Sequence, residues 1–218
     1  MARVLDLHNL MLTPENQRNG DWEAAFFQAL VEGRLKVDPV EPQPGPDGWP
    51  YLLVQTSPAA SEPAVKILDW LSTRGIGMVV NATKMPPDYV FTYGMIWNWR
   101  ERGEFVTAST VIENAPIEFS EGEKVLAGAP TKQYLPDYAR SVLDQFFASQ
   151  GISDPRILVI SKDQKHFDLC FSLESLGDPP EHERAGIAEA IAWFMPPHYS
   201  IVLISEKGLP NFSNLKVG

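Results

Sequence analysis

The 218-residue sequence predicts an α+β protein built from two lobes. Segments in which apolar residues recur at helical spacing alternate with short apolar runs suited to strands. Prolines and glycines separate these segments, as expected for turns and loops. The length fits one large domain or two small ones of roughly 100 residues each. We therefore expect each lobe to be a small mixed or antiparallel sheet covered by helices.

The N-terminal lobe is expected to span residues 1–114. Its first helix is predicted over 21–33, where apolar side chains recur every three or four positions and Gly33 can end the helix. A loop with five prolines follows over 38–50. Further elements are expected at 51–56 (strand), 61–73 (helix), 78–80 (strand) and 105–112 (strand).

Large side chains occupy six consecutive odd positions in the segment 89–99. Period two is typical of a β-strand, so one strand face would be a continuous aromatic strip. Such a strip can pack beneath the helices as core. It can also form a partly exposed binding surface, because Tyr, Trp and Arg are enriched at interface hot spots. The candidate binding residues are Tyr93, Trp97, Trp99 and Arg100.

The C-terminal lobe is expected over 122–218, after a boundary at 115–122. A helix beginning near Leu135 has the clearest amphipathic pattern in the chain, and Leu135, Val142, Leu143 and Phe146 should pack on a sheet. The other expected elements are strands at 157–160, 166–173 and 201–204, a helix after Pro180, and a polar tail at 209–218.

The opening of this lobe, Gly122-Glu123-Lys124-Val125-Leu126-Ala127-Gly128-Ala129-Pro130, is followed by helix, strand, strand, helix and strand. This region resembles the C-terminal domain of the bacterial SseB (enhanced serine sensitivity) family over residues 122–206. In the first lobe, the Glu23–Leu30 helix and the Gly75–Asn81 segment are similar to the N-terminal domain of that family. The resemblance implies a bacterial α+β protein and brings no catalytic residues with it.

Three chemically active side chains, His166, Asp168 and Cys170, alternate along one predicted strand. They are the parts of a cysteine nucleophile system, but the carboxylate lies between the other two, which is the wrong order for a relay. We expect a polar strand face with Phe167, Leu169 and Phe171 turned to the core. A zinc site from the same residues would need a further ligand that the sequence does not indicate.

Composition narrows the classes of function. A formal charge of −10 and a pI near 4.8 disfavour binding to nucleic acid and to anionic membranes. The single cysteine excludes an intramolecular disulfide and suits a reducing cytoplasm. No secretory signal, membrane span, phosphate loop or dinucleotide loop is recognisable. We therefore predict no cofactor and no metal.

These observations favour a non-enzymatic bacterial cytoplasmic protein of two α+β lobes that binds another protein. The alternative is an enzyme whose pocket lies between the lobes, because clefts between lobes are common ligand sites. The sequence leaves the reaction type of such an enzyme open.

Overall fold

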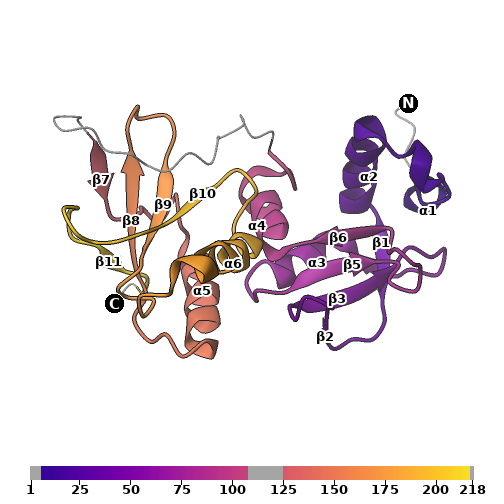
Figure 1. Cartoon of the computed structure of the whole chain (residues 1–218). Coiled ribbons are helices and arrows are strands. Elements are labelled where there is room, and N and C mark those ends of the chain that lie inside the picture. Colours follow the sequence, from indigo (N-terminus) through magenta and orange to yellow (C-terminus); the bar gives the residue numbers. More distant parts are fainter. Residues whose placement is uncertain (1–5, 108–124, 217–218) are drawn as a thin grey trace. The chain divides into compact units, whose positions relative to one another are not determined.

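The computed structural model describes residues 6–107 and 125–216, and it confirms an α+β fold with two mixed sheets (Figure 1). The chain divides into two compact units, Met1–Phe105 and Val106–Gly218. Each unit is described by itself below. The boundary expected at 115–122 lies outside the described residues.

The first unit contains one mixed sheet and four α-helices in its described part. The helices are α1 (Leu7–Leu10), α2 (Gly20–Glu32), α3 (Ala64–Leu71) and α4 (Tyr93–Arg102), with a 3-10 turn η1 (Glu15–Gln17). The strands are β1 (Arg34–Val37), β2 (Gln43–Pro44), β3 (Pro50–Gln55), β4 (Glu62–Pro63), β5 (Gly77–Val80) and β6 (Tyr89–Phe91). They run in the order β4-β1-β3-β5-β6, and β2 pairs with β3. Of the strand pairs within residues 6–107, only β3 and β5 are parallel.

Local sequence explains where two of these helices begin. In α2, the Asn19 side chain accepts a hydrogen bond from the Trp22 amide at 3.0 Å, which satisfies a free N–H of the first turn. The helix α3 was expected to start at Ser61 but starts at Ala64. The preceding residues Glu62 and Pro63 form the strand β4, which pairs with β1. They therefore cannot form the first turn of the helix.

The aromatic strand predicted over 89–99 is wrong beyond Phe91. Thr92 begins α4, because its hydroxyl accepts a hydrogen bond from the Met95 amide at 3.2 Å. The helix ends at Gly103, which adopts a left-handed backbone conformation with φ of 77°. Alternating large residues therefore wrap around a helix instead of lining one face of a strand.

The core of the first unit is rich in aromatic rings. Phe26 of α2 is fully buried and stacks on Trp22, with ring centroids 5.2 Å apart. It also contacts Tyr89 and Phe91 of β6 at 5.2 and 6.0 Å. Phe105 closes this cluster against Phe91 at 4.8 Å. The residues 105–107 form no strand, and the rest of the strand expected at 105–112 lies outside the described residues.

The second unit contains another mixed sheet. Its helices are α5 (Asp137–Ser149) and α6 (Glu181–Trp193). Its strands are β7 (Leu126–Gly128), β8 (Arg156–Ser161), β9 (Asp168–Ser172), β10 (Ser200–Ile204) and β11 (Ser213–Asn214). The order is β10-β9-β8-β11, with β7 also paired to β8. Among the strands described in residues 125–216, only β9 and β10 pair in parallel.

Most of the predicted inner face of α5 is buried, but one residue was assigned wrongly. Leu135, Val142 and Leu143 are buried as expected. Phe146 is only partly buried, whereas the next residue, Phe147, is 1% exposed and contacts Phe171 of β9 at 5.7 Å. The spacing therefore gave the correct helix and most of its inner face, but Phe147 takes the buried position expected for Phe146.

The segment 209–218 is not simply a polar tail. Its residues Ser213 and Asn214 form β11, which pairs antiparallel with the beginning of β8. Leu215 is fully buried, and its amide donates to the Pro155 carbonyl at 2.9 Å. One apolar residue in a polar segment thus secures the described end of the chain to the sheet.

The two units share an order of elements. In the first, α2 leads into β1 and β3, then α3 and β5; in the second, α5 leads into β8 and β9, then α6 and β10. The pairing matches as well, because the first two strands are antiparallel and the last two are parallel. Each unit therefore places a helix between its two parallel strands, as a parallel connection requires.

Candidate functional site

A cleft of the first unit lies where β5 ends and β6 begins. Its volume is about 720 Å³, and it has three walls: residues 11–18 around η1, the start of α2, and the loop 84–89. Asn81, which begins the connection from β5 to β6, follows the carboxyl end of the parallel strand pair. In open α/β sheets, ligands commonly bind beyond the carboxyl ends of the parallel strands, and β3 and β5 are such a parallel pair.

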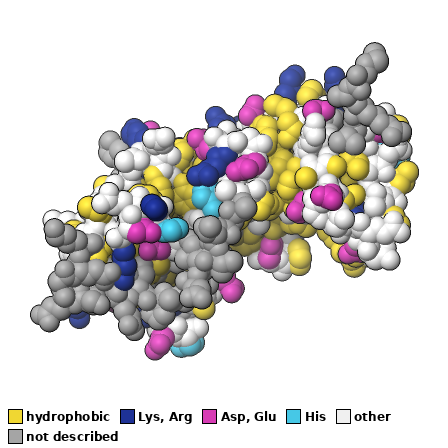
Figure 2. Space-filling model, turned by 90° about the horizontal axis from the view of Figure 1, so that it is seen from above, with side chains coloured by type: hydrophobic (Ala, Val, Ile, Leu, Met, Phe, Trp, Pro, Cys, Tyr) yellow, Lys and Arg dark blue, Asp and Glu magenta, His cyan; other side chains and the backbone are white. Residues whose placement is uncertain are grey.

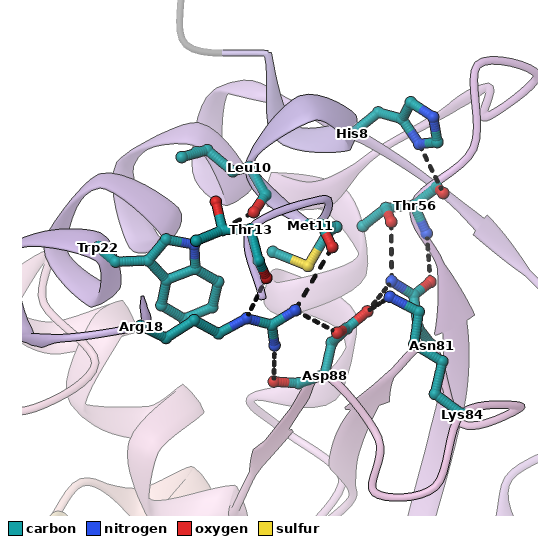
Figure 3. Close-up of polar contacts among 10 residues, drawn as sticks. All are labelled: His8, Leu10, Met11, Thr13, Arg18, Trp22, Thr56, Asn81, Lys84 and Asp88. Carbon is teal, nitrogen blue, oxygen red and sulfur yellow. Dashed lines mark hydrogen bonds and ion pairs between the residues drawn. The ribbon is translucent and has the colours of Figure 1, made fainter. Parts of the chain in front are cut away.

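An ion-pair network forms the floor of this cleft. Asp88 Oδ1 lies 2.7 Å from Arg18 Nη2, and Asp88 Oδ2 lies 2.6 Å from both Lys84 Nζ and Asn81 Nδ2. Figure 3 shows the carboxylate between the Arg18 guanidinium on one side and Asn81 and Lys84 on the other. We call Arg18, Asn81, Lys84 and Asp88 the Asp88 clasp. It joins the η1 wall to the 84–89 wall.

Asn81 fits its place in the clasp for two reasons. Its φ of 56° is in the left-handed region, which asparagine tolerates better than most residues. Its amide also joins two loops, because Oδ1 accepts from the Thr56 amide at 2.9 Å while Nδ2 donates to Thr56 Oγ1 at 2.8 Å. Both loops follow parallel strands, so Asn81 holds the ends of β3 and β5 together.

Arg18 is fixed by more than its ion pair. Its Nε donates to the Thr13 carbonyl at 3.1 Å, and Nη2 also approaches the Met11 carbonyl at 3.4 Å. The guanidinium carbon lies 4.7 Å from the centre of the Trp22 ring, within the range of a cation–π contact. The Trp22 indole donates to the Leu10 carbonyl at 3.1 Å, so α2 is tied to the same wall.

The environment of Asp88 keeps it ionised. Burial by itself would raise the pKa of this carboxyl, since its side chain is only 4% exposed. Hydrogen bonds from Lys84, Asn81 and Arg18 outweigh burial and hold the pKa below its ordinary value of 3.8. A carboxylate with such a low pKa and three donors is a poor proton acceptor near neutral pH. The clasp is therefore suited to fixing the walls.

The rim of the cleft is apolar and exposed. Leu12 on the η1 side is 68% exposed, and Met85 on the opposite loop is 98% exposed. Pro14 and Pro86 also line the cleft. We call the space between these rims the Leu12–Met85 cleft. It combines a floor held by ion pairs with apolar side chains that are open to solvent.

The binding residues expected from the sequence lie elsewhere, on α4. Tyr93 and Trp97 are 0% and 1% exposed, and the Tyr93 hydroxyl donates to the Ser72 carbonyl at 2.8 Å. Trp99 is partly buried and packs on the core, 6.1 Å from Phe105. Arg100 is exposed, and its Nη1 donates to Ser72 Oγ at 2.6 Å. The helix therefore does not present these four residues as one aromatic strip.

The residues His166, Asp168 and Cys170 do not share an exposed strand face. His166 precedes β9 and contacts Asp163, with Nδ1 2.5 Å from Oδ2. Cys170 is fully buried beside Leu158 and Ile160. Burial, with a smaller contribution from Asp168, raises the pKa of the Cys170 thiol to about 12. Both faces of β9 are buried, so the expected polar face is wrong, and Phe167 is exposed.

The second unit has its own polar network at the equivalent ends of its parallel strands. Glu174 follows β9 and accepts hydrogen bonds from the Ser205 hydroxyl at 2.5 Å and from the Glu206 amide at 3.0 Å. Glu206 follows β10 and pairs with Arg156 at 2.7 Å. These contacts join adjacent strand ends, as Asn81 does in the first unit.

Within residues 6–107 and 125–216, no group of three or more His, Cys, Asp or Glu side chains is arranged to hold a metal ion. No helix of that part of the chain is long and apolar enough to cross a membrane. On the face in view in Figure 2, acidic and basic side chains are interspersed over the surface.

Sequence reasoning missed the cleft because its walls come from distant segments. Arg18 and Asp88 are 70 positions apart, and no local pattern pairs them. The signals available were an apolar Leu10-Met11-Leu12 run beside Thr13-Pro14, and Met85 directly before two prolines in a polar loop. Leu10 and Met11 pack in the core, whereas Leu12 and Met85 stay exposed to solvent.

Comparisons with known proteins identify no relative of this chain. No protein-family model, no curated protein and no solved structure matches this chain. The resemblance of residues 122–206 to the SseB family therefore stays a prediction.

Proposed function

We propose that this chain is a non-enzymatic protein-binding module and that the Leu12–Met85 cleft receives the partner. The observation that carries the proposal is the pairing of two strongly exposed apolar side chains across one cleft. Exposed apolar patches on otherwise polar proteins commonly mark interaction sites. The resemblance to the SseB family would place such a module in the bacterial cytoplasm.

The construction of the cleft supports this role. Binding costs less when the site is already ordered, because fewer groups lose freedom on association. The Asp88 clasp ties two walls together, and the Trp22 indole ties the start of α2 to the Leu10 carbonyl. The low pKa of Asp88 argues against proton transfer as the task of this floor.

Site-specific photo-crosslinking tests the proposal. A benzophenone amino acid at position 85, introduced in cells of the host organism, should give a defined protein adduct. The same group at position 40 is the matched control, since Val40 is 78% exposed in the same unit but does not line the cleft. Leu12→Ser should suppress the adduct at position 85. Identical adducts at both positions, or none at position 85, would contradict the proposal.

A further inference from the structure

The charged side chains that line the Leu12–Met85 cleft are unequally engaged. They are Arg18, Lys84, Glu15, Glu23 and Asp88, two cations against three carboxylates. Arg18 and Lys84 both point at Asp88, at 2.7 and 2.6 Å. Both cations therefore contact the carboxylate of the floor, while the two glutamates belong to the η1–α2 wall.

Both glutamates can still accept hydrogen bonds. Glu15 is exposed and forms no ion pair with the rest of the described chain. Glu23 accepts from the Tyr89 hydroxyl at 2.6 Å through Oε1, which leaves Oε2 without a donor among residues 6–107 and 125–216. The N-terminus of α2 carries the positive end of the helix dipole. The Asn19 cap and the carboxylates of Asp21 and Glu23 in the first turn already compensate it. The η1–α2 wall thus presents negative charge to the cleft.

The opposite wall differs in charge. Lys84 is about half exposed, so the 84–89 loop carries a cation beside Met85. A binding partner therefore meets Leu12 with two glutamates on the η1–α2 side and Met85 with a lysine on the 84–89 side. This polarity would orient an extended segment within the cleft, since like charges across an interface are unfavourable.

We propose that the partner presents a peptide segment with a large apolar side chain next to a lysine or arginine. The apolar side chain lies between Leu12 and Met85, and the cation contacts Glu15 and Glu23 on the η1–α2 wall. This inference rests on the proposed protein-binding function and adds the chemistry of the partner. The acidic character of the whole chain, with a formal charge of −10, adds long-range attraction for such a segment.

An unbiased peptide library displayed on phage tests the chemistry of the partner. The full chain is immobilised and binding peptides are selected. Peptides that also bind the Met85→Ser variant are then removed, so that only peptides dependent on the cleft remain. We expect the surviving peptides to be enriched in a large apolar residue adjacent to lysine or arginine. Surviving peptides that lack a cation would overturn the inference and leave the proposed function standing. If no peptide depends on Met85, both fail.

Charge reversal on the wall then tests the contact itself. The affinity of the strongest selected peptide is measured by fluorescence anisotropy at low and physiological salt. Glu15→Lys should weaken binding about five- to tenfold at low salt and reduce its salt dependence. Glu41→Lys is the matched control, because Glu41 is exposed in the same unit but does not line the cleft. Equal losses in both variants, or no loss with Glu15→Lys, would overturn the assigned contact.

Discussion

Arg18 Nη2 lies 2.7 Å from Asp88 Oδ1, although the two residues are 70 positions apart in the chain. The pair joins the segment before α2 to the loop before β6. Both side chains are largely withdrawn from solvent, so their attraction is screened less than that of a surface pair. The contact links the two walls of the Leu12–Met85 cleft directly.

Removing the charge of Asp88 should weaken the first unit. In Asp88→Asn, an NH₂ group would replace one of the two carboxylate oxygens. At least one donor among Arg18, Lys84 and Asn81 would then lose its acceptor. We expect a loss of about 3 kcal/mol in the free energy of unfolding. Urea denaturation followed by tryptophan fluorescence measures it, because five of the six tryptophans (Trp22, Trp49, Trp70, Trp97 and Trp99) lie in this unit.

The matched control is Asp38→Asn. Asp38 pairs with Lys36 at 3.0 Å, but both side chains are about half exposed. Pairs of this kind contribute about 0–1 kcal/mol, so the control should change stability little. Equal effects of the two substitutions would show that burial of the Asp88 clasp contributes nothing.

The contribution of Asp88 should also depend on pH. Its pKa in the folded chain lies below the ordinary value, so its stabilising effect is complete above the unfolded pKa of about 3.9 and is lost as pH falls through the folded pKa. The stability difference between wild type and Asp88→Asn should stay constant from about pH 7 to 5 and narrow below about pH 4. A difference that persists unchanged at about pH 2.5 would refute this account.

The thiol of Cys170 should be inert in the folded protein. The residue is fully buried, and its pKa is raised to about 12, so the reactive thiolate is scarce at neutral pH. We expect negligible labelling by a maleimide reagent near pH 7 and complete labelling after denaturation in guanidinium chloride. Rapid labelling of the native chain would mean that β9 opens or that the thiol is exposed.

Two adjacent phenylalanines on α5 should differ in their effect on stability. Phe147→Ala should cost about 3–5 kcal/mol, because the ring is 1% exposed and contacts Phe171. Phe146→Ala should cost less, since Phe146 is only partly buried. Urea denaturation followed by far-ultraviolet circular dichroism compares the two. The reverse ranking would restore the inner face that the sequence spacing predicts.

Helical spacing and short apolar runs were enough to identify several elements of this protein. The helices α2 and α5 and the strands β3, β8 and β10 all lie where local patterns predict them, with boundaries shifted by a few residues. These patterns work because a half-buried helix or a buried strand must repeat its apolar residues with the period of its own backbone. The α+β fold class follows from their alternation.

Only the tertiary structure decided the role of the aromatic segment and the position of the cleft. Residues 93–99 alternate as a strand would, yet the Thr92 cap and the packing of Met95 and Ile96 on the core select a helix. The cleft depends on Arg18 and Asp88, which meet only after the sheet has formed. A sequence records each residue's own preference, whereas a contact across 70 positions depends on how every intervening element packs.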